Sequence, residues 1–322
     1  MEKESTPNQS NESWDALIIG SGIGGLVTAS QLAAKGAKVL VLEQYKIPGG
    51  SSGAFYRKGY TFDVGASMIF GFAENGHTNL LTRALADVGE HCETIPDPVQ
   101  LVYHLPNGLE IGVKRNYEEF ISLLTNFFPH EKNGIKAFYD TCWKVFKCLD
   151  SMPLLSIEDP SYLAKVFLRA PLSCLGLARW LPVNVGDVAR KHIKDPKLLN
   201  FIDIECFCWS VMPANKTPMI NAGMVFSDRH AGGINYPVGG VGVIAQKLVK
   251  GLINFGGEIR YKSLVKKILI ENNKAVGIEL ENGEKIKAKK IISNATRWNT
   301  FGKDGLISEK NIPSSEKRWN NR

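Results

Sequence analysis

The stretch Ala16-Leu17-Ile18-Ile19-Gly20-Ser21-Gly22-Ile23-Gly24-Gly25 decides the fold of this 322-residue chain. Its apolar start is typical of a buried β-strand, and its glycines then follow the pattern GxGxxG. Residues 26–35 read as a helix that Gly36 ends, and residues 38–42 read as a second strand followed by Glu43. Strand, glycine-rich turn, helix, strand and acid in this order predict a βαβ unit that binds a dinucleotide.

Each glycine of the turn has a physical task in such a site. Gly20 allows the tight turn, Gly22 lets the backbone approach a pyrophosphate, and Gly25 lets the helix pack closely on the strand. Gly24 lies at the helix N-terminus, where unpaired N–H groups and a partial positive charge favour phosphate. Glu43 is placed to accept hydrogen bonds from a ribose diol, and its charge disfavours a 2′-phosphate. The alternative is a glycine-rich turn without a ligand.

A second run of small residues, Pro48-Gly49-Gly50-Ser51-Ser52-Gly53, follows the second strand. It predicts a backbone nest whose N–H groups meet another side of the pyrophosphate. Such a segment is a feature of FAD-binding Rossmann proteins of the glutathione-reductase-like superfamily, which the chain resembles from Asp15 onward. The run also matches GxSxG, with Ser51 as a hydrolase nucleophile. That elbow needs a strand before it and a helix after it, whereas residues 54–62 read as strand or loop.

Composition places the chain among ordinary globular proteins, with 44% hydrophobic and 22% charged residues. The formal net charge of +7 is uneven, because residues 247–322 hold 17 basic and 8 acidic side chains. Basic and apolar residues alternate there, as in Lys285-Ile286-Lys287-Ala288-Lys289, which is typical of the solvent face of half-buried strands. We therefore expect no nucleic acid as a partner.

The cysteine spacing argues against a metal site, and the N-terminal residues argue against a targeting signal. The six cysteines form no CxxC pair and have no histidine cluster nearby, so we expect reduced thiols and no metal site. Residues 1–13 are polar and read as a disordered lead-in, without the features of a secretion signal or a transit peptide. Residues 16–34 are uncharged and long enough to span a bilayer, but four of them are the glycines of the βαβ unit.

The later motifs give the chain a family resemblance. Gly59-Tyr60-Thr61-Phe62-Asp63-Val64-Gly65 looks like the segment that runs a strand past the flavin in phytoene-desaturase-like and amine-oxidase-like flavoproteins. Further along come Gly232 to Gly240, a helix over 243–255, and strands over 258–262, 265–271, 275–281 and 285–293. This order is similar to that of carotenoid desaturases and isomerases, and within them the chain looks closest to the carotenoid cis–trans isomerases.

The resemblance covers residues 15 to about 301 and implies a discontinuous domain plan. The fold class is α/β, with an FAD-binding Rossmann-like domain formed by 14–74 and 229–301. A helix-rich region over 75–228 is inserted to take the substrate and dock on a membrane. Family members continue with a second glycine-rich segment, so we expect 302–322 to be the cut-short start of the remaining substrate domain. We also expect these 322 residues alone to bind FAD weakly and not to isomerise.

The resemblance also implies roles for single residues. The residue matching Val265 lies beside the adenine through its backbone, and Asn294 and Ala295 end the strand that returns to the flavin. The flavin itself is the catalyst, assisted by reduction with NAD(P)H as an indirect reductant.

Acid–base candidates are Asp63, Glu205 and His230. Each has a structural alternative: a strand-end cap for Asp63, a buried ion pair with Arg190 or Arg229 for Glu205, and a core hydrogen bond for His230.

The segment over 154–181 has the composition of a helix pair that lies in a membrane interface, with leucines and aromatics among Lys165, Arg169 and Arg179. A plain helical subdomain is the equal alternative.

By resemblance, the predicted function is FAD-dependent conversion of poly-cis lycopene to all-trans lycopene, with reduced flavin and no net redox change. The expected place is the cytoplasmic face of a membrane, as a peripheral protein, in a cyanobacterial-type cell. Two alternatives stay open. One is an FAD-dependent carotenoid desaturase or related oxidoreductase. The other is a non-catalytic prenyl-lipid carrier, like the Rab escort and GDP-dissociation-inhibitor proteins of this fold. The oligomeric state is left open.

Overall fold

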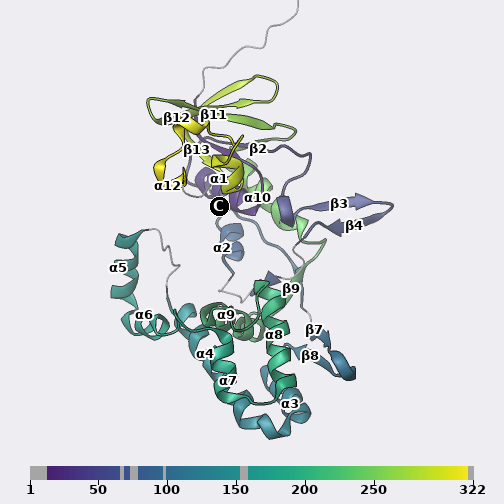
Figure 1. Ribbon diagram of the computed structural model, residues 1–322. Helices are drawn as coiled ribbons and strands as arrows, with labels where there is room; N and C mark the ends of the chain where they lie inside the picture. The colour runs from purple at the N-terminus through teal and green to yellow at the C-terminus, as the bar shows by residue number, and fades with distance from the viewer. Residues whose placement is uncertain (1–12, 66–68, 73–78, 97–98, 153–158, 318–322) are drawn as a thin grey trace, which may run out of the picture. The chain divides into compact units, whose positions relative to one another are not determined.

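The computed structural model describes residues 13–65, 69–72, 79–96, 99–152 and 159–317 (Figure 1). These residues divide into two compact units. Unit 1 lies within residues 1–67, 81–93 and 237–322, and unit 2 within 68–80 and 94–236. Apart from Ser13, the predicted lead-in over 1–13 lies outside the described residues.

Unit 1 is built on a six-stranded sheet. Its strands are β1 (Trp14–Ile19), β2 (Val39–Leu42), β10 (Glu258–Arg260), β11 (Val265–Glu271), β12 (Lys274–Leu280) and β13 (Lys285–Ser293). Their order is β10-β2-β1-β13-β12-β11. The first four in this order run parallel, and β12 and β11 continue the sheet as an antiparallel meander. The predicted strands are therefore confirmed, and the sheet joins the two ends of the chain.

The residue pattern explains why the central strands are covered on both faces. β1 and β2 are almost continuously apolar, as parallel strands are when helices or strands cover both sides. Ile18 and Val41 pack in one cluster with Ala29, Ala33 and Leu252 of the flanking helices. On the opposite face, Leu17, Ile19, Leu40 and Leu42 pack with residues of the β11–β13 meander.

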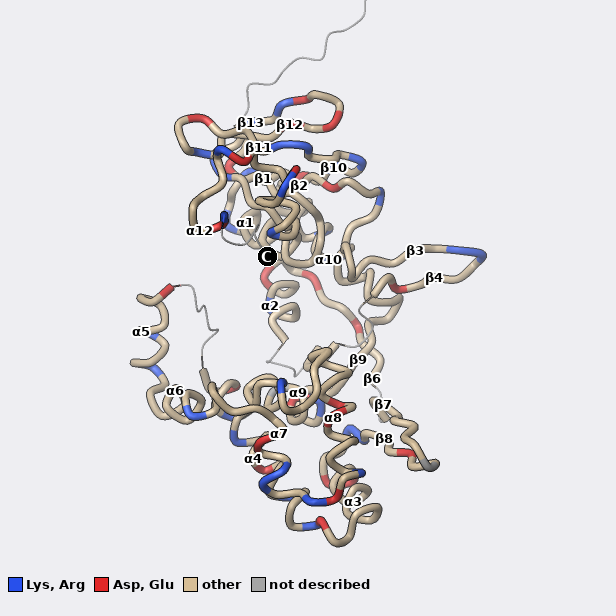
Figure 2. The backbone as a smooth tube through the Cα atoms, in the orientation of Figure 1, with Lys and Arg blue, Asp and Glu red and all other residues tan. Residues whose placement is uncertain are grey.

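The meander shows the alternation that its sequence predicts. In β13, Ile286 and Ala288 are buried while Lys285, Lys287 and Lys289 are exposed. Figure 2 shows basic residues, with acidic ones among them, along the β11–β13 meander.

Helices α1 (Ile23–Ala34), α10 (Gly242–Asn254) and α2 (Leu80–Ala86) accompany the sheet of unit 1. Segment 81–93 belongs to this unit, although the prediction assigns it to the helix-rich region. Hydrogen bonds and ion pairs explain the difference. Gln31 Nε2 donates to Ala84 O at 3.0 Å, and the Glu90 carboxylate lies 3.1 Å from Lys247 Nζ and 2.7 Å from Lys250 Nζ.

The described part of 302–317 also packs on unit 1, whereas the prediction has it begin another domain. Ile268 N donates to Leu306 O at 2.8 Å, so this segment lies against β11. The elements here are α11 (Arg297–Phe301), the 3₁₀ turn η4 (Glu309–Asn311) and α12 (Ser314–Lys317). The Arg297 guanidinium pairs with the Glu316 carboxylate and ties α11 to α12.

A two-stranded hairpin of β3 (Ala54–Arg57) and β4 (Tyr60–Asp63) follows the second glycine-rich turn. Lys58 and Gly59 both have positive φ, which is the geometry of a tight two-residue hairpin turn. Phe55 and Phe62 stack across the strands with ring centroids 5.3 Å apart, and both remain exposed. The segment is thus an exposed hairpin in the chain as described.

Unit 2 is mainly helical. Its helices are α3 (Tyr117–Phe127), α4 (Lys132–Asp150), α5 (Pro160–Arg169), α6 (Pro171–Ala178), α7 (Val185–His192), α8 (Pro196–Ser210) and α9 (Met219–Ala231). Its short strands are β5 (Ile69–Phe70), β6 (Thr94–Pro96), β7 (Val99–His104), β8 (Glu110–Lys114) and β9 (Ile234–Pro237). The 3₁₀ turns η2 (Pro106–Gly108) and η3 (Pro129–Glu131) precede β8 and α4.

The core of unit 2 lies around α4. Phe138, Cys142 and Val145, which are spaced for one helix face, are buried together with residues of α3, α8 and α9. At Gly223 of α9 a Cβ atom would lie 2.4 Å from Val145 Cγ1, so this glycine permits close packing of α9 on α4. The predicted helices over 117–127 and 134–149 are confirmed as α3 and α4. Among the helices described, none combines the length and the apolar character needed to cross a membrane.

Candidate functional site

The carboxyl ends of β1, β2 and β13 meet at one edge of the unit 1 sheet. Gly20 N donates to Leu42 O at 2.8 Å, and Asn294 N donates to Ile19 O at 2.9 Å. The chain leaves β1 toward β2 on one side, while β13 lies on the other, so the strand order reverses here. Such a switch point is where open α/β sheets bind ligands.

The first glycine-rich turn connects β1 to α1 at this edge. A Cβ at Gly25 would lie 2.2 Å from Gly20 O, so only glycine lets α1 start so close to the strand. Leu26 N donates to Gly22 O at 2.9 Å, and no side chain in the described residues caps the N-terminus of α1. The first turn of α1 also carries no acidic residue. The N-terminus of α1 in the described chain therefore has neither a capping side chain nor an acidic residue in its first turn, which suits the anion that the sequence predicts there.

The second glycine-rich turn lies directly against the first. Gly49 N donates to Ser21 O at 2.8 Å, and Gly22 and Gly49 form a parallel β-bridge. Gly49 and Gly50 adopt φ of 109° and 56°, which favour glycine. A Cβ at Gly50 would lie only 3.4 Å from Gly22 Cα. Two stretches of bare backbone thus face each other at the carboxyl edge of the sheet.

Ser51 and Ser52 lie in the 3₁₀ turn η1 (Gly50–Ser52), which leads into β3. The strand-to-helix elbow of a GxSxG hydrolase is absent from this described segment.

Glu43 holds the first glycine-rich turn in place through hydrogen bonds. Its Oε2 accepts hydrogen bonds from Ser21 N at 2.7 Å and from Ser21 Oγ at 2.6 Å, and its Oε1 accepts from Tyr45 N at 2.9 Å. The carboxylate is buried, and a carboxylate can accept about four hydrogen bonds. One acceptor position therefore remains for a ribose hydroxyl. Ser21 has no predicted role, because the fingerprint accepts any residue at that position.

Asn294 lies beside the first turn. A Cβ at Gly22 would lie 2.7 Å from Asn294 Nδ2, and a Cβ at Gly24 would lie 2.9 Å from Asn294 Oδ1. The carboxamide therefore stands at the surface where a phosphate would approach, with a donor and an acceptor available. Ala295 follows it, two residues beyond the last residue of β13.

The segment before β11 runs beside the end of β2. Ser263 N donates to Glu43 O at 2.8 Å, and Lys262 N donates to Tyr45 O at 3.1 Å. Val265, the residue matched to an adenine contact, is buried two positions further on. Burial raises the pKa of Tyr261, and the charge of Glu43 adds to the rise, so this phenol stays protonated at neutral pH.

These residues fit a dinucleotide whose pyrophosphate lies between two glycine-rich turns. Backbone N–H groups and the N-terminus of α1 would hold the phosphates, while Glu43 and the 262–265 segment flank the place of a ribose and an adenine. The predicted residues Gly20, Gly22, Gly24, Gly25, Glu43, Gly49, Gly50, Ser51, Ser52, Val265, Asn294 and Ala295 lie along this edge or in the segments that border it.

The first acid–base candidate, Asp63, stands at the end of β4. Val241 N donates to Asp63 Oδ1 at 3.0 Å, which satisfies a backbone donor at the N-terminus of α10. The strand-end cap is therefore the geometry found here.

Glu205 and Arg229 form a fully buried ion pair in unit 2, between α8 and α9. The Arg229 guanidinium also lies over the Phe120 and Phe226 rings, 4.9 and 5.2 Å from their centroids. Burial raises the pKa of Glu205, against the opposing pull of Arg229. Tyr139 OH donates weakly to Glu205 Oε2, at 3.5 Å.

His230 adjoins this pair in the same core. Its Nδ1 donates to Arg115 O at 3.1 Å, and its Nε2 accepts from Arg229 Nε at 3.2 Å. Burial, with the nearby Arg229 charge, lowers the pKa of His230 to about 3. The neutral imidazole is thus part of a structural network, and the structure gives both Glu205 and His230 the core partners foreseen as their alternatives.

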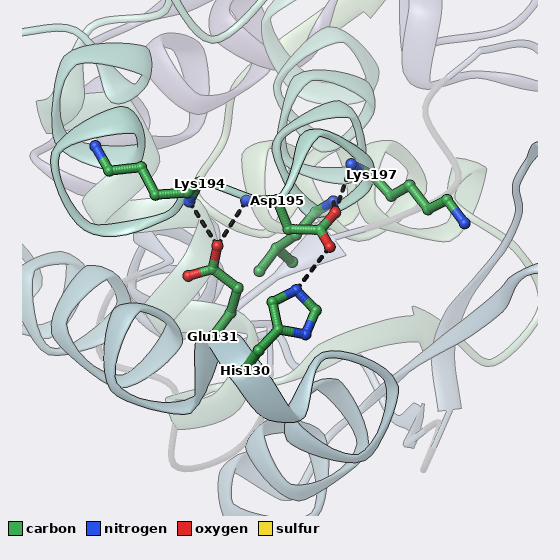
Figure 3. A network of polar contacts seen from close by, with 6 residues as sticks. His130, Glu131, Lys194, Asp195 and Lys197 are labelled. Atoms are coloured by element: carbon green, nitrogen blue, oxygen red, sulfur yellow. Dashed lines mark hydrogen bonds and ion pairs between the residues drawn. The ribbon is translucent and has the colours of Figure 1, made fainter.

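A second polar network, shown in Figure 3, joins the starts of α4 and α8. The buried Glu131 Oε1 accepts hydrogen bonds from Lys194 N and Asp195 N, each at 2.6 Å. Asp195 caps α8 by accepting from Lys197 N at 2.8 Å, and its other oxygen lies 2.8 Å from His130 Nε2. The network borders a surface cavity of about 420 Å³. The acid-before-proline spacing of Asp195 is the sequence signal for this cap.

Comparisons with known proteins agree with this geometry. A family model for an NAD(P)-binding Rossmann-like domain matches residues 18–85. The chain is 59% identical over 306 residues to the chloroplastic prolycopene isomerase of Daucus carota, covering 95% of this chain and 49% of that protein. It is 56% identical over 306 residues to the chloroplastic prolycopene isomerase of Arabidopsis thaliana, covering 95% and 51%. The chain thus spans about half the length of these relatives.

More distant matches extend to other proteins of the fold. A neurosporene-forming phytoene desaturase of Cereibacter sphaeroides is 27% identical over 298 residues, covering 89% of this chain and 54% of that protein. An oxidoreductase structure from Methanosarcina mazei superposes with a TM-score of 0.64 at 21% identity, covering 95% and 65%. A Rab GDI structure from Plasmodium falciparum gives a TM-score of 0.58 at 13% identity, covering 89% and 66%. These structures establish the α/β fold with a Rossmann-like domain.

Proposed function

We propose that the chain belongs to an FAD-dependent prolycopene isomerase, which converts poly-cis lycopene to all-trans lycopene without net redox change. The observation that carries the proposal is the 59% identity to a prolycopene isomerase over 95% of this chain. The paired glycine-rich turns support the cofactor part of the proposal, because the second turn provides a further backbone surface for a pyrophosphate.

In this proposal the residues of unit 1 bind FAD and fix its position. Backbone N–H groups of the two turns bind the pyrophosphate, and Glu43 orients a ribose while it holds Ser21. The Asn294 carboxamide lies beside Gly22 and Gly24, where it would hydrogen-bond the cofactor at the edge of the first turn. When bound, reduced FAD would supply the electron or proton donation that transiently lowers the order of a conjugated double bond. NAD(P)H is the proposed indirect reductant.

Catalysis by Asp63, Glu205 or His230 is the weaker part of the proposal. Each of these side chains has a structural partner in its own unit, which supports a scaffolding role. The cofactor residues are therefore the ones on which the proposed activity depends.

The proposed setting is a plastid membrane. Both of the most similar relatives described above are named chloroplastic, which favours a plastid over a cyanobacterial-type cell. Poly-cis lycopene is a water-insoluble hydrocarbon, so the enzyme must collect it from a membrane as a peripheral protein.

The desaturase alternative is less well supported, since the phytoene desaturase match is only 27% identical. The prenyl-lipid carrier alternative has the likeness to Rab GDI in its favour, and that likeness concerns the fold alone.

Flavin binding is the first test. The purified chain should quench FAD fluorescence on titration, and Gly25→Ala should weaken FAD binding at least about tenfold, because the new Cβ would meet Gly20 O. Gly112→Ala is the matched control, since its Cβ would lie in ordinary contact, 3.6 Å from Val99 Cγ1. Circular dichroism must show that both variants fold. No FAD binding by the folded parent chain would contradict the cofactor proposal.

The reaction is tested in a hybrid protein. The 306 matching residues of the Daucus carota enzyme are replaced with those of this chain, and the hybrid receives FAD under reducing conditions. We expect all-trans lycopene from poly-cis lycopene and no new double bonds from phytoene. A folded, flavin-loaded hybrid that desaturates phytoene, or that leaves poly-cis lycopene unchanged, would contradict the isomerase proposal.

A further inference from the structure

Helices α5 and α6 of unit 2 expose several large apolar side chains. Leu168, Leu172 and Leu175 are exposed by 79%, 83% and 60%, and Phe167 by 45%. In a plain helical subdomain such residues would face the core, as Val166 and Leu177 do in the same two helices. The structure therefore leaves a leucine-rich face uncovered, and an uncovered apolar face of this kind marks an interaction site.

The charges along this segment are of one sign. Residues 160–182 contain Lys165, Arg169 and Arg179 and no aspartate or glutamate. All three basic side chains are exposed, and the tube in Figure 2 carries blue segments along α5 and α6. Asp159, just before α5, caps the helix by accepting from Ser161 N and Tyr162 N. The leucine face is thus flanked by cations.

Contacts with the rest of unit 2 hold α6 in place. Ser151 Oγ and Ser173 Oγ lie 2.8 Å apart, and Cys174 Sγ lies 3.5 Å from Met152 Sδ, so α6 is fastened to the end of the α4 segment. Leu177 and Trp180 pack against the unit 2 core. These contacts anchor α6, and α5 packs on α6, while Leu168, Leu172 and Leu175 stay exposed.

We propose that the α5–α6 leucine face is the surface by which this protein docks on a membrane that carries anionic lipids. The leucines enter the boundary between headgroups and acyl chains, and Lys165, Arg169 and Arg179 pair with the lipid phosphates. This inference rests on the proposed function, because an enzyme that acts on a hydrocarbon substrate has to reach it in a bilayer.

Charge decides between a membrane and a second copy of the chain as the occupant. A symmetric self-contact would bring the three cations of each copy toward those of the other, without an anion in 160–182 to balance them. A bilayer rich in anionic lipid offers both the apolar layer for the leucines and the negative charge for the cations.

The test measures sedimentation of the 322-residue chain with vesicles of phosphatidylcholine containing phosphatidylglycerol, and with vesicles of phosphatidylcholine alone. We expect binding to the anionic vesicles that weakens as salt is raised. Replacing the leucines should lower the affinity at least about 100-fold. Replacing the three cations with glutamine should lower it by a similar factor. The leucine variant is Leu168→Asn, Leu172→Asn and Leu175→Asn.

Matched controls carry equal changes elsewhere on exposed positions. The apolar control is Ile95→Asn, Val102→Asn and Ile253→Asn, and the charge control is Lys274→Gln, Lys285→Gln and Lys287→Gln. Both controls should bind anionic vesicles within about threefold of the parent. If instead the charge control abolishes binding and the α5–α6 variants do not, the basic strands of unit 1 are the lipid site and the inference is wrong.

Hydrogen exchange locates the contact directly. Amides of 160–181 should gain protection on vesicle addition, while sedimentation equilibrium without vesicles should show a monomer. Protection of 160–181 that arises from self-association alone would overturn the inference. FAD titration on the same samples separates the two proposals: a chain that binds FAD but no vesicles refutes only the docking surface, and one that binds vesicles but no FAD refutes only the cofactor proposal.

Discussion

At the residue scale, single polar groups are used mainly to hold backbone in place. Glu43 fixes the first glycine-rich turn through both donors of Ser21, and Asp63 fixes the start of α10 through Val241 N. His230 does the same in unit 2, where it bonds to Arg115 O and to Arg229 Nε. Of these groups, the buried His230 makes stability depend on pH, because its pKa is lowered in the folded state.

His230 gives a prediction with a definite sign. Its pKa falls to about 3 in the folded protein from 6.5 in the unfolded chain, so the unfolded state binds more protons between these values. The contribution of His230 to the free energy of unfolding is therefore fully present above about pH 6.5 and is lost as the pH falls toward 3. Urea unfolding should show about 2 kcal/mol less stability from this group at pH 5 than at pH 7.5. His230→Gln should be less stable than the parent at pH 7.5. Its free energy of unfolding should change less between pH 5 and pH 7.5, by the same about 2 kcal/mol. An unchanged pH slope in the variant would contradict the assignment.

At the element scale, helix starts and tight turns set the positions of the elements. Gly25 brings α1 close to β1, and Gly223 brings α9 close to α4. In unit 2 the start of α8 is the best-defined junction, since Asp195 caps that helix while Glu131 accepts from two backbone N–H groups just before it (Figure 3). Burial raises the pKa of Asp195, but hydrogen bonds from His130 and the α8 backbone outweigh it, so the pKa lies below its usual value.

The helix cap and the His130 contact of Asp195 can be separated by two substitutions. Asp195→Ala removes both and should lower the free energy of unfolding by about 1 kcal/mol or more. Asp195→Asn keeps an acceptor for Lys197 N but loses the charge opposite His130, and should cost only a few tenths of a kcal/mol because that contact is exposed. Urea denaturation at pH 7 measures both. Equal losses in the two variants would assign the stability to the His130 contact rather than to the cap.

At the scale of the whole molecule, the ends of the described chain are joined in one sheet. β1 lies between β2 and β13, so residues 14–19 and 285–293 are neighbours across most of the sequence. The glycine-rich site depends on this join, because Asn294 reaches it only through β13. The intervening residues 94–236 form a unit with a core of their own.

This join predicts the effect of shortening the chain. A chain that ends at residue 284 lacks β13, which exposes β1 and removes Asn294, so unit 1 should lose its cooperative unfolding transition and its FAD binding. A chain that ends at residue 317 retains every described element and should bind FAD like the parent. Thermal unfolding followed by circular dichroism and FAD titration measure the two effects. Retention of FAD binding by the shorter chain would contradict the role assigned to β13.

The sequence by itself determined the βαβ unit, the strands of the meander and helices α3 and α4, because periodicity and glycine spacing are local properties of the chain. It also identified the two glycine-rich turns and Glu43. Only the tertiary structure decided that Ser21 bonds to Glu43, that Asn294 lies beside Gly22 and Gly24, and that Glu205 pairs with Arg229 rather than Arg190. The exposure of Leu168 and Leu172 was likewise decided there. Contacts between residues distant in sequence, and the side of a helix that finds a partner, depend on how the elements pack, which local patterns do not encode.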